Sequence, residues 1–208
     1  MTPLKRLLDI AVATILLVLL FPLIVWIAVR LRVREGPPVL YLSERMKTPE
    51  KSFRLWKFRT MTVVEDDEGV SGGNKRHRIT PTGKWLRRYR LDELPQLWNV
   101  LRGDISFIGP RPPLRSYVEQ FPELYGEVLK SRPGVSGLAT LAYHKTEERL
   151  LARCRTAEET EEVYTRRCVP RKARLDLIYA RRRNVCWDMR LMFATIFRRV
   201  TIRTRKPR

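Results

Sequence analysis

One apolar run near the start of the chain limits the possible folds more than any other feature. Residues 10–29 read IAVATILLVLLFPLIVWIAV and contain no charged side chain. As a helix, this run extends about 30 Å, the hydrocarbon thickness of a bilayer. A signal peptide has a shorter apolar core and a cleavage site of small residues, whereas RLRVRE follows here. The sequence therefore predicts a membrane anchor over residues 1–35.

The anchor has two possible topologies. Lys5 and Arg6 precede the apolar run, three arginines follow it within residues 30–34, and Pro22 lies inside it. Proline lacks a backbone donor and clashes with the preceding turn, so we expect a kink there. A kinked helix can cross the bilayer, or it can break near Pro22 and return to the same face. Basic residues at both ends favour the second, re-entrant form, because positive charge stays in the cytoplasm.

Residues 36–208 have the pattern of a compact α+β catalytic domain, mainly helical with a small β element. We expect strands in 36–42 and 52–62, and helices in 81–90, 95–102, 114–130, 146–168, 172–183 and 188–200. The last of these helices carries a broad apolar stripe and basic residues, which suits either a helix in the membrane interface or a core-facing helix with a basic tail.

Charge narrows the class of partner. The chain has 42 Lys and Arg against 22 Asp and Glu, a formal net charge of +20. Such an excess indicates polyanionic partners: nucleic acid, anionic lipid headgroups or phosphorylated substrates. The strand SFRLWKFRTMT (52–62) would present a cationic face to such a partner, or serve as a solvated edge strand. We interpret EDDE (65–68) as a solvated loop rather than a metal cage.

An acidic pair stands out in this basic chain. In RLDELPQLWNVLRG (90–103), Pro95 suits the first position of a helix and Gly103 its C-terminal cap. Asp92 and Glu93 therefore come at or just before a helix N-terminus. Acids there are stabilised by the helix dipole, and capping alone would account for both residues.

Nearby arginines suggest a chemical role for the same pair. Three arginines within residues 87–90 precede it, Arg111 is fixed between prolines in GPRPP, and Arg132 lies in the turn RPG. Guanidinium groups around a helix N-terminus form a natural phosphate site. We expect these cations to keep Asp92 ionised and Glu93 to help it hold a divalent cation, which suits phosphoryl transfer through an aspartyl phosphate.

Longer motifs carry a resemblance over nearly the whole chain. The sequence resembles the bacterial sugar transferases, the monotopic phosphoglycosyl transferases whose small representatives consist of the catalytic domain alone. The motifs are GPPVLYLSERM, FRLWKFRTM, RITPTGKWLRRYRLDELPQLWNVLRGDISFIGPRPPL, SRPGVSGLA and LDLIYARRRNVCWDMRLM. In the family the anchor breaks at a Ser-Pro pair, whereas this chain has Phe21-Pro22.

The resemblance implies a reaction. A carboxylate attacks the sugar-proximal phosphorus of a nucleotide diphosphosugar, usually a UDP-sugar, and UMP leaves. A polyprenol (undecaprenyl) phosphate then takes the sugar phosphate, the first membrane step of glycoconjugate or exopolysaccharide biosynthesis. Asp92 matches the nucleophile, and Glu93 matches its partner, so that both face Mg²⁺.

The resemblance also implies binding residues, partners and a location. Residues matched to substrate binding are Lys57, Arg59, Arg87, Arg111 and Arg132. We expect membrane lipids as partners, a possible homo-oligomer, no nucleic acid, and a bacterial inner membrane with the catalytic domain on its cytoplasmic face. Two other classes remain from the residues alone: a membrane-tethered nucleic-acid binder, and a scaffold with an inactive site.

Overall fold

The computed structural model describes residues 2–63 and 77–197, so the EDDE segment and the chain after residue 197 lie outside the described residues. Helices are α1 (Pro3–Glu35), α2 (Pro81–Tyr89), η2 (Leu91–Glu93), α3 (Gln96–Arg102), α4 (Arg115–Gln120), α5 (Pro122–Val128), α6 (Leu138–Leu151), α7 (Ala157–Val163), η3 (Tyr164–Cys168), α8 (Val169–Arg182) and α9 (Val185–Phe197). Strands are β1 (Leu40–Met46), β2 (Ser52–Phe58), β3 (Ser106–Ile108) and β4 (Gly134–Ser136). The predicted mainly helical α+β class is confirmed.

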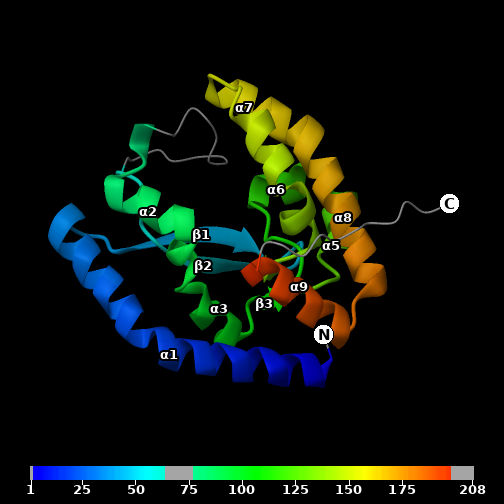
Figure 1. Cartoon of the computed structure of the whole chain (residues 1–208). Coiled ribbons are helices and arrows are strands. Elements are labelled where there is room, and N and C mark those ends of the chain that lie inside the picture. The colour runs from blue at the N-terminus through cyan, green and yellow to red at the C-terminus, as the bar shows by residue number, and fades with distance from the viewer. Residues whose placement is uncertain (1, 64–76, 198–208) are drawn as a thin grey trace.

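The apolar N-terminal segment forms one helix, α1. Thr2 caps its first turn through its side chain, and Gly36, at a φ of 70°, follows its last residue. Pro22 lies in the interior, and the blue helix in Figure 1 changes direction along its length, as an internal proline allows. Helical structure nevertheless continues on both sides of Pro22.

One face of α1 packs on the rest of the chain. Ala13 is buried with residues of β2 and α3, while Ile27 and Leu31 are buried beside Phe58 and Leu86. The other face exposes large apolar side chains: Leu4, Leu7, Ile10, Ile15, Val18, Leu19, Phe21, Val25, Trp26, Val29 and Val33. By length and composition α1 could cross a membrane, and an apolar surface of this extent needs a non-aqueous partner.

Two small sheets form the centre of the molecule (Figure 1). β1 and β2 are antiparallel, with Leu40 opposite Phe58, and β3 pairs in parallel with β4. The short helix α3 packs against both α1 and β2. Its fully buried Asn99 accepts from the Trp56 amide at 3.0 Å and donates to the Arg54 carbonyl at 2.8 Å. This side chain fixes the helix that follows the acidic pair against the strand that carries Lys57.

A helical lobe, defined here as α5 to α8 with η3, covers one side of the sheets. The predicted helical stretch 114–130 consists of two helices, because α4 ends before Phe121 and Pro122 starts α5. A residue before proline is disfavoured in the α region, and Phe121 has a φ of −130°.

The predicted helical stretch 146–168 is also divided, and its first helix extends beyond the predicted start. Helix α6 begins much earlier, after Gly137, and the chain breaks before Thr156. The Thr156 hydroxyl accepts from the Glu159 amide at 3.1 Å, while the Glu159 carboxylate accepts from the Arg155 amide at 2.8 Å. Such reciprocal capping starts a new helix, and a threonine followed three residues later by a glutamate is its sequence sign.

The last described helix, α9, has two different faces. Leu191 and Ala194 are buried against the body of the protein, whereas Phe193 and Phe197 are largely exposed. The core-facing interpretation of this segment is therefore correct for one face, and the other face remains available to a membrane surface.

Candidate active site

The acidic pair lies on a tight 3₁₀ turn between α2 and α3. Arg90, the residue that caps α2, has a φ of 56° in the left-handed region, which is unfavourable for a side chain of this kind. The turn η2 follows at once and carries Asp92 and Glu93, and α3 then ends at Gly103 with a φ of 78°. Strained backbone of this sort clusters at functional sites. The predicted placement just before a helix N-terminus is confirmed.

Glu93 is held by cations. Its Oε1 accepts from Arg111 at 2.8 Å and from Lys57 Nζ at 3.3 Å, and Arg90 lies 3.9 Å from Oε2. Burial alone would raise the pKa of Glu93, but Arg111 and Lys57 together outweigh it and hold the pKa well below its usual value. Burial, assisted by the Arg111 charge, lowers the pKa of Lys57 to about 8. Glu93 is thus an ionised, immobilised carboxylate.

Asp92 has a different environment. Among the residues that the structure describes, none donates a hydrogen bond to Asp92 or forms an ion pair with it. Burial and the neighbouring Glu93 charge raise the pKa of Asp92, and the more distant Lys57, Arg87 and Arg111 only oppose this. The cations thus act in the expected direction, towards the ionised form of Asp92, but burial and the Glu93 charge outweigh them. An ionised Asp92 stays a prediction. The two carboxyls have opposite pKa shifts, and such a separation is typical of a pair with two roles.

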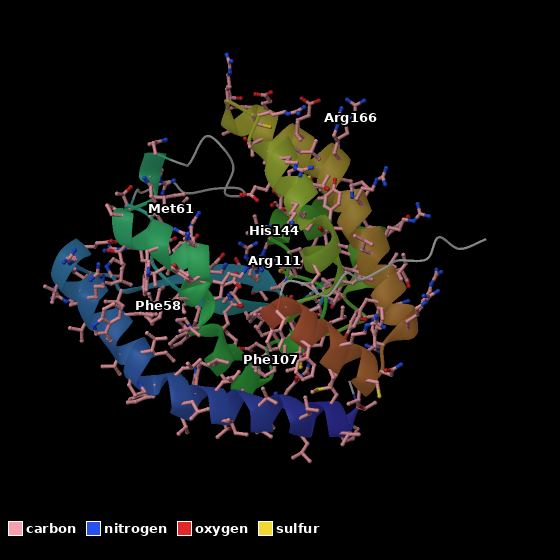
Figure 2. The ribbon with its side chains drawn as sticks, viewed as in Figure 1. Phe58, Met61, Phe107, Arg111, His144 and Arg166 are labelled. Atoms are coloured by element: carbon pink, nitrogen blue, oxygen red, sulfur yellow. The ribbon has the colours of Figure 1, made fainter. Side chains whose placement is uncertain are left out.

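Both carboxyls line a cavity of about 570 Å³ between the strands and the helical lobe. Figure 2 shows Arg111 and His144, which also line it, near the middle of the molecule. The strand wall, defined as the side formed by β1, β2, α2 and the segment around Arg111, carries most of the cations, including Lys57, Arg87 and Arg90. The volume is sufficient for a ligand of nucleotide size.

The lobe wall, defined as the lining residues of α5, α6, η3 and α8, was not anticipated from the sequence. Lys172 donates to Glu147 at 3.0 Å and to the Tyr164 hydroxyl at 3.2 Å, and Asp176 lies one turn further along α8. One signal in the sequence could have indicated Asp176: it is an acid at a core position of a helix, since Val169, Ala173 and Asp176 are buried at helical spacing.

Two of the predicted arginines lie at the cavity with different surroundings. Arg87 Nε donates to the Thr60 hydroxyl at 2.9 Å on the strand wall. Arg59 also borders the cavity, but its guanidinium donates to the carbonyls of Glu35, Gly36 and Pro37 at 2.7–2.9 Å. The Glu35 carbonyl is the last of α1 and the other two directly follow the helix, so Arg59 caps the C-terminal end of α1 in this arrangement.

Arg132 lies apart from the other predicted binding residues. It does not line the large cavity but a smaller one of about 230 Å³, with Lys5 and Arg183. It also lies beside Gly103, where a Cβ would come within 3.3 Å of its guanidinium. The structure therefore brings Lys57, Arg59, Arg87 and Arg111 together with the acidic pair, and leaves Arg132 at a second location.

The donor set at the acidic pair suits a particular kind of metal. Within the described residues, no group of three His, Cys, Asp or Glu side chains could hold an ion by itself. Mg²⁺, however, usually binds through one or two carboxylates, with water and substrate phosphates completing its shell. Within residues 2–63 and 77–197, no cation forms an ion pair with Asp92, and the ion pair of Glu93 Oε2 is the long contact with Arg90. These residues fit Mg²⁺ bound together with a phosphorylated substrate.

Comparison with known proteins identifies the family of the chain. A family model described as bacterial sugar transferase matches residues 1–202. The chain is 36% identical over 198 residues to a UDP-glucose:undecaprenyl-phosphate glucose-1-phosphate transferase of Klebsiella pneumoniae, covering 93% of this chain and 39% of that protein. A relative of the same name from Escherichia coli (strain K12) is 35% identical over 94% of this chain and 40% of its own length.

A third relative is named for a different sugar. The UDP-N-acetylgalactosamine-undecaprenyl-phosphate N-acetylgalactosaminephosphotransferase of Aeromonas hydrophila is 38% identical over 67% of this chain and 34% of its own length. The chain thus spans about two fifths or less of these curated relatives. Nearly its whole length matches the family model, with the acidic pair and its arginines inside the matched region. The chain belongs to the bacterial sugar transferase family.

Proposed function

We propose that this protein is a phosphoglycosyl transferase, which moves a sugar-1-phosphate from a UDP-sugar to undecaprenyl phosphate. The relatives named above carry this activity in their names, although the chain spans only part of their lengths. One observation carries the proposal: Asp92, which has no hydrogen-bond or ion-pair partner among the described residues, lies beside the cation-held Glu93 in a cavity rich in guanidinium groups. A free carboxylate next to phosphate-binding cations suits nucleophilic attack on phosphorus.

The proposed reaction has two balanced steps. An Asp92 carboxylate oxygen attacks the sugar-proximal phosphorus, the bond from that phosphorus to the bridging oxygen breaks, and UMP leaves with the electron pair. The sugar phosphate is then held on Asp92 as an acyl phosphate. An oxygen of the lipid phosphate attacks the same phosphorus, and the Asp92 carboxylate is released unchanged.

The surrounding residues have separate tasks in this scheme. Arg111 and Lys57 hold Glu93 ionised and fixed. Arg87 and Arg90 line the strand wall, where they would stabilise the negative charge of the phosphate oxygens. Raising the pKa of Asp92 makes its ionised form a stronger base and a better nucleophile. Mg²⁺, when held by Asp92 and Glu93 with the substrate phosphates, would neutralise negative charge that repels the attacking carboxylate.

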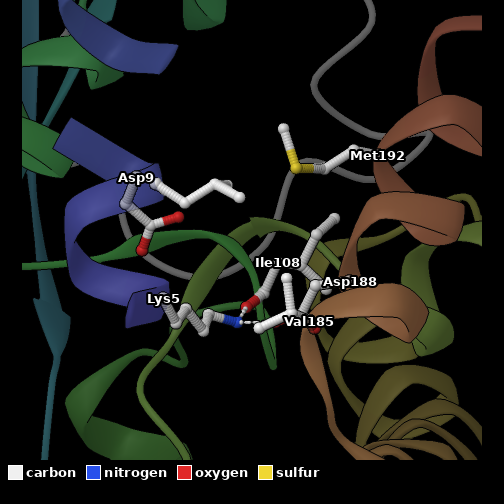
Figure 3. Close-up of a pocket in the computed structure, with 7 residues that line it drawn as sticks. Lys5, Asp9, Ile108, Val185, Asp188 and Met192 are labelled. Carbon is white, nitrogen blue, oxygen red and sulfur yellow. Dashed lines mark hydrogen bonds and ion pairs between the residues drawn. The ribbon is translucent and has the colours of Figure 1, made fainter. Parts of the chain in front are cut away.

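The contacts of α1 support the re-entrant topology. At its N-terminal end, Lys5 donates to the Ile108 carbonyl at 2.9 Å and to Asp188 (Figure 3), and also to the Tyr179 hydroxyl at 3.0 Å. At its C-terminal end, Arg59 caps the last carbonyls. A straight helix of this length would extend about 50 Å, enough to place its ends on opposite sides of a bilayer. Both ends instead contact the same folded body.

Aromatic and basic side chains near the C-terminal half of α1 support a position at the bilayer surface. Trp26 of α1 packs edge-on against Trp85 of α2, with ring centroids 5.9 Å apart. The Trp85 ring in turn lies 6.0 Å from the ring of Tyr89. Arg30 lies over the Trp26 ring and Arg88 over the Tyr89 ring. Tryptophan and tyrosine with arginine are typical of the headgroup layer. Together with the basic flanks of α1, this favours the cytoplasmic face of the bacterial inner membrane.

The test of the reaction uses the full chain in detergent or nanodiscs with Mg²⁺ and a panel of UDP-sugars. We expect UMP release from at least one donor, and Asp92→Asn to lower it by about 10³-fold or more. Intact-protein mass spectrometry should find a sugar phosphate added to Asp92. Glu119→Gln removes an exposed acid outside the cavity and should release UMP like the unaltered protein. Undiminished UMP release by the Asp92 variant, or an adduct mapped elsewhere, excludes the proposed nucleophile.

Topology is tested by labelling single cysteines. Thr2→Cys and Arg34→Cys, each with Cys186→Ser, place one exposed thiol at either end of α1. In inverted inner-membrane vesicles a membrane-impermeant maleimide should label both positions. Labelling at only one end would favour the kinked transmembrane alternative.

A further inference from the structure

Asp176 on the lobe wall is a buried acid that the proposed chemistry does not use. It is 7% exposed, and its Oδ1 has no hydrogen-bond partner within the described part of the chain. It lines the same cavity as Asp92. An unsatisfied buried polar atom destabilises a protein, so its presence needs an explanation. A ligand that hydrogen-bonds to the Asp176 carboxyl is one, since this residue lines a cavity that a substrate would fill.

The neighbouring cation does not satisfy Asp176. Lys172, one turn earlier on α8, donates to Glu147 at 3.0 Å and to the Tyr164 hydroxyl at 3.2 Å. Burial raises the pKa of Asp176 to about 7, and Lys172 only partly opposes it. Near neutral pH this carboxyl can therefore act as either donor or acceptor. A group with both capacities matches a hydroxyl, which also donates and accepts.

The two walls of the cavity suit different parts of a UDP-sugar. Lys57, Arg87 and Arg111 on the strand wall suit the diphosphate. On the lobe wall, Lys172 is neutralised by Glu147 and leaves little net positive charge for a phosphate. This wall instead offers carboxyl, hydroxyl and ammonium groups, the donors and acceptors that an uncharged sugar requires.

The tyrosine rings on this wall are poorly placed for a nucleobase, and Tyr125 is buried in the hydrophobic core of the lobe. Tyr164 packs against Tyr117 at 5.1 Å, and the Lys172 ammonium lies 5.0 Å from its ring centroid. A uracil ring would need a free aromatic face for stacking, and these contacts already occupy the Tyr164 ring. The polar edge of this wall favours the sugar over the nucleoside.

We propose that the lobe wall is the sugar subsite of the donor, with Asp176 hydrogen-bonded to a ring hydroxyl and helping to select among UDP-sugars. This inference rests on the proposed function, because it presupposes a UDP-sugar in the cavity. Glu147, fixed by Lys172, forms the adjacent part of the subsite. A site that pairs a buried polar group with a substrate hydroxyl discriminates against donors in which that hydroxyl is absent or inverted.

The first experiment measures binding without turnover. In the Asp92→Asn background, dissociation constants for UDP and for the preferred UDP-sugar are obtained by calorimetry, with and without Asp176→Asn. We expect Asp176→Asn to weaken the UDP-sugar by about 10-fold, the effect of losing a hydrogen bond to a carboxyl, and UDP by less than about twofold. Equal weakening of both ligands overturns the inference, because it would place the nucleoside or the phosphates at this wall.

A second experiment measures selectivity in the otherwise unaltered protein. UDP-glucose, UDP-galactose and their N-acetylated counterparts compete in one reaction, and lipid-linked products are counted by mass. We expect Asp176→Asn to change the ratio of kcat/KM between two donors by about 10-fold. A uniform loss across all donors, with unchanged ratios, would show that Asp176 only supports the fold and would overturn the inference.

A matched control separates general from local effects. Glu161→Gln removes a carboxylate of the same lobe that accepts from Tyr117 at 2.8 Å and does not line the cavity. It should leave donor ratios and both dissociation constants unchanged. The proposed function can fail separately: UDP-sugar binding that depends on Asp176, with no UMP release by the unaltered protein, would sustain the subsite and exclude the transferase. A protein that binds UDP but no UDP-sugar more tightly would exclude the subsite alone.

Discussion

The strand wall and the lobe wall each bury a carboxyl, but in opposite electrostatic settings. Glu93 on the strand wall has Arg111 and Lys57 within 3.3 Å, and its pKa is lowered. Asp176 on the lobe wall has no cation bound to its Oδ1 among the residues that the structure describes, and its pKa is raised to about 7. Burial raises the pKa in both cases, so the cations make the difference. One cavity thus contains a carboxyl that must remain charged and another that can be neutral.

The largest expected effect comes from removing the charge on the strand wall. Glu93→Gln leaves Arg111 and Lys57 buried around a neutral amide, and it removes one carboxylate that would hold Mg²⁺. We expect UMP release to fall by about 100-fold or more, with a lower melting temperature. Initial rates and thermal melts test both, with Glu119→Gln as the control. Activity within tenfold of the unaltered protein would contradict the role given to Glu93.

A smaller effect should follow from changing the shape of the cation while its charge stays. Arg111→Lys keeps one positive charge but loses the planar fork that can contact Glu93 and a phosphate together. We expect kcat/KM for the UDP-sugar to fall by about 10-fold. Arg111→Met, which removes the charge as well, should fall further. If the lysine variant performs as poorly as the methionine variant, geometry rather than charge is the essential property.

On the lobe wall the same kind of change should stabilise the protein. The pKa of Asp176 is about 7 in the folded chain and 3.8 ordinarily, so the folded state retains a proton that the unfolded chain loses between these values. Stability therefore decreases as pH rises from about 4 to 7 and stays low above it. Asparagine cannot ionise, so Asp176→Asn should raise the melting temperature at pH 8 by about 3 °C or more.

The control for this prediction is the pH itself. At pH 5 the melting temperatures of Asp176→Asn and the unaltered protein should differ much less than at pH 8. A constant difference at both values would mean that the carboxyl does not titrate in this window. Together with the loss of sugar selectivity, a stabilised variant would identify Asp176 as a residue that functions at the expense of stability.

The smallest effect is expected at Arg132, outside both walls. Its position beside Gly103 leads us to expect that Arg132→Ala changes the dissociation constant for UDP by about twofold or less. Calorimetry with Arg111→Met as a reference compares the two arginines directly. An effect as large as that of Arg111 would support the sequence-based assignment of Arg132 to the nucleotide and would imply a rearrangement on binding.

Local signals in the sequence were sufficient for most elements. Pro95 and Gly103 correctly bounded α3, and the alternation in SFRLWKF gave β2. The breaks within the two predicted helical stretches 114–130 and 146–168 were not predicted. The capping box at Thr156 divides α6 from α7, and the restriction that Pro122 imposes on Phe121 divides α4 from α5. Both signals are short and act against an otherwise continuous helical pattern.

The sequence predicted the residues of the strand wall but not those of the lobe wall. Asp92, Glu93, Lys57 and Arg111 belong to compact motifs, and charge complementarity alone indicates that they meet. The lobe wall comes from α6 and α8, and its polar groups carry no motif of their own. The roles of Arg59 and Arg132 depend on where a long side chain points, which residue spacing does not determine. Only the packing of the lobe on the sheets brings Asp176 to the cavity.

The attachment of α1 at both ends has a consequence for how the protein meets its lipid substrate. Lys5 and Arg6 join its first turns to the body, and Arg59 joins its last. With α1 embedded as proposed, no flexible linker separates the membrane-embedded helix from the domain that contains the cavity. The fold itself then sets the height of the cavity relative to the bilayer. A thicker or thinner bilayer would have to deform around the protein, while Asp92 keeps its height above the acyl chains.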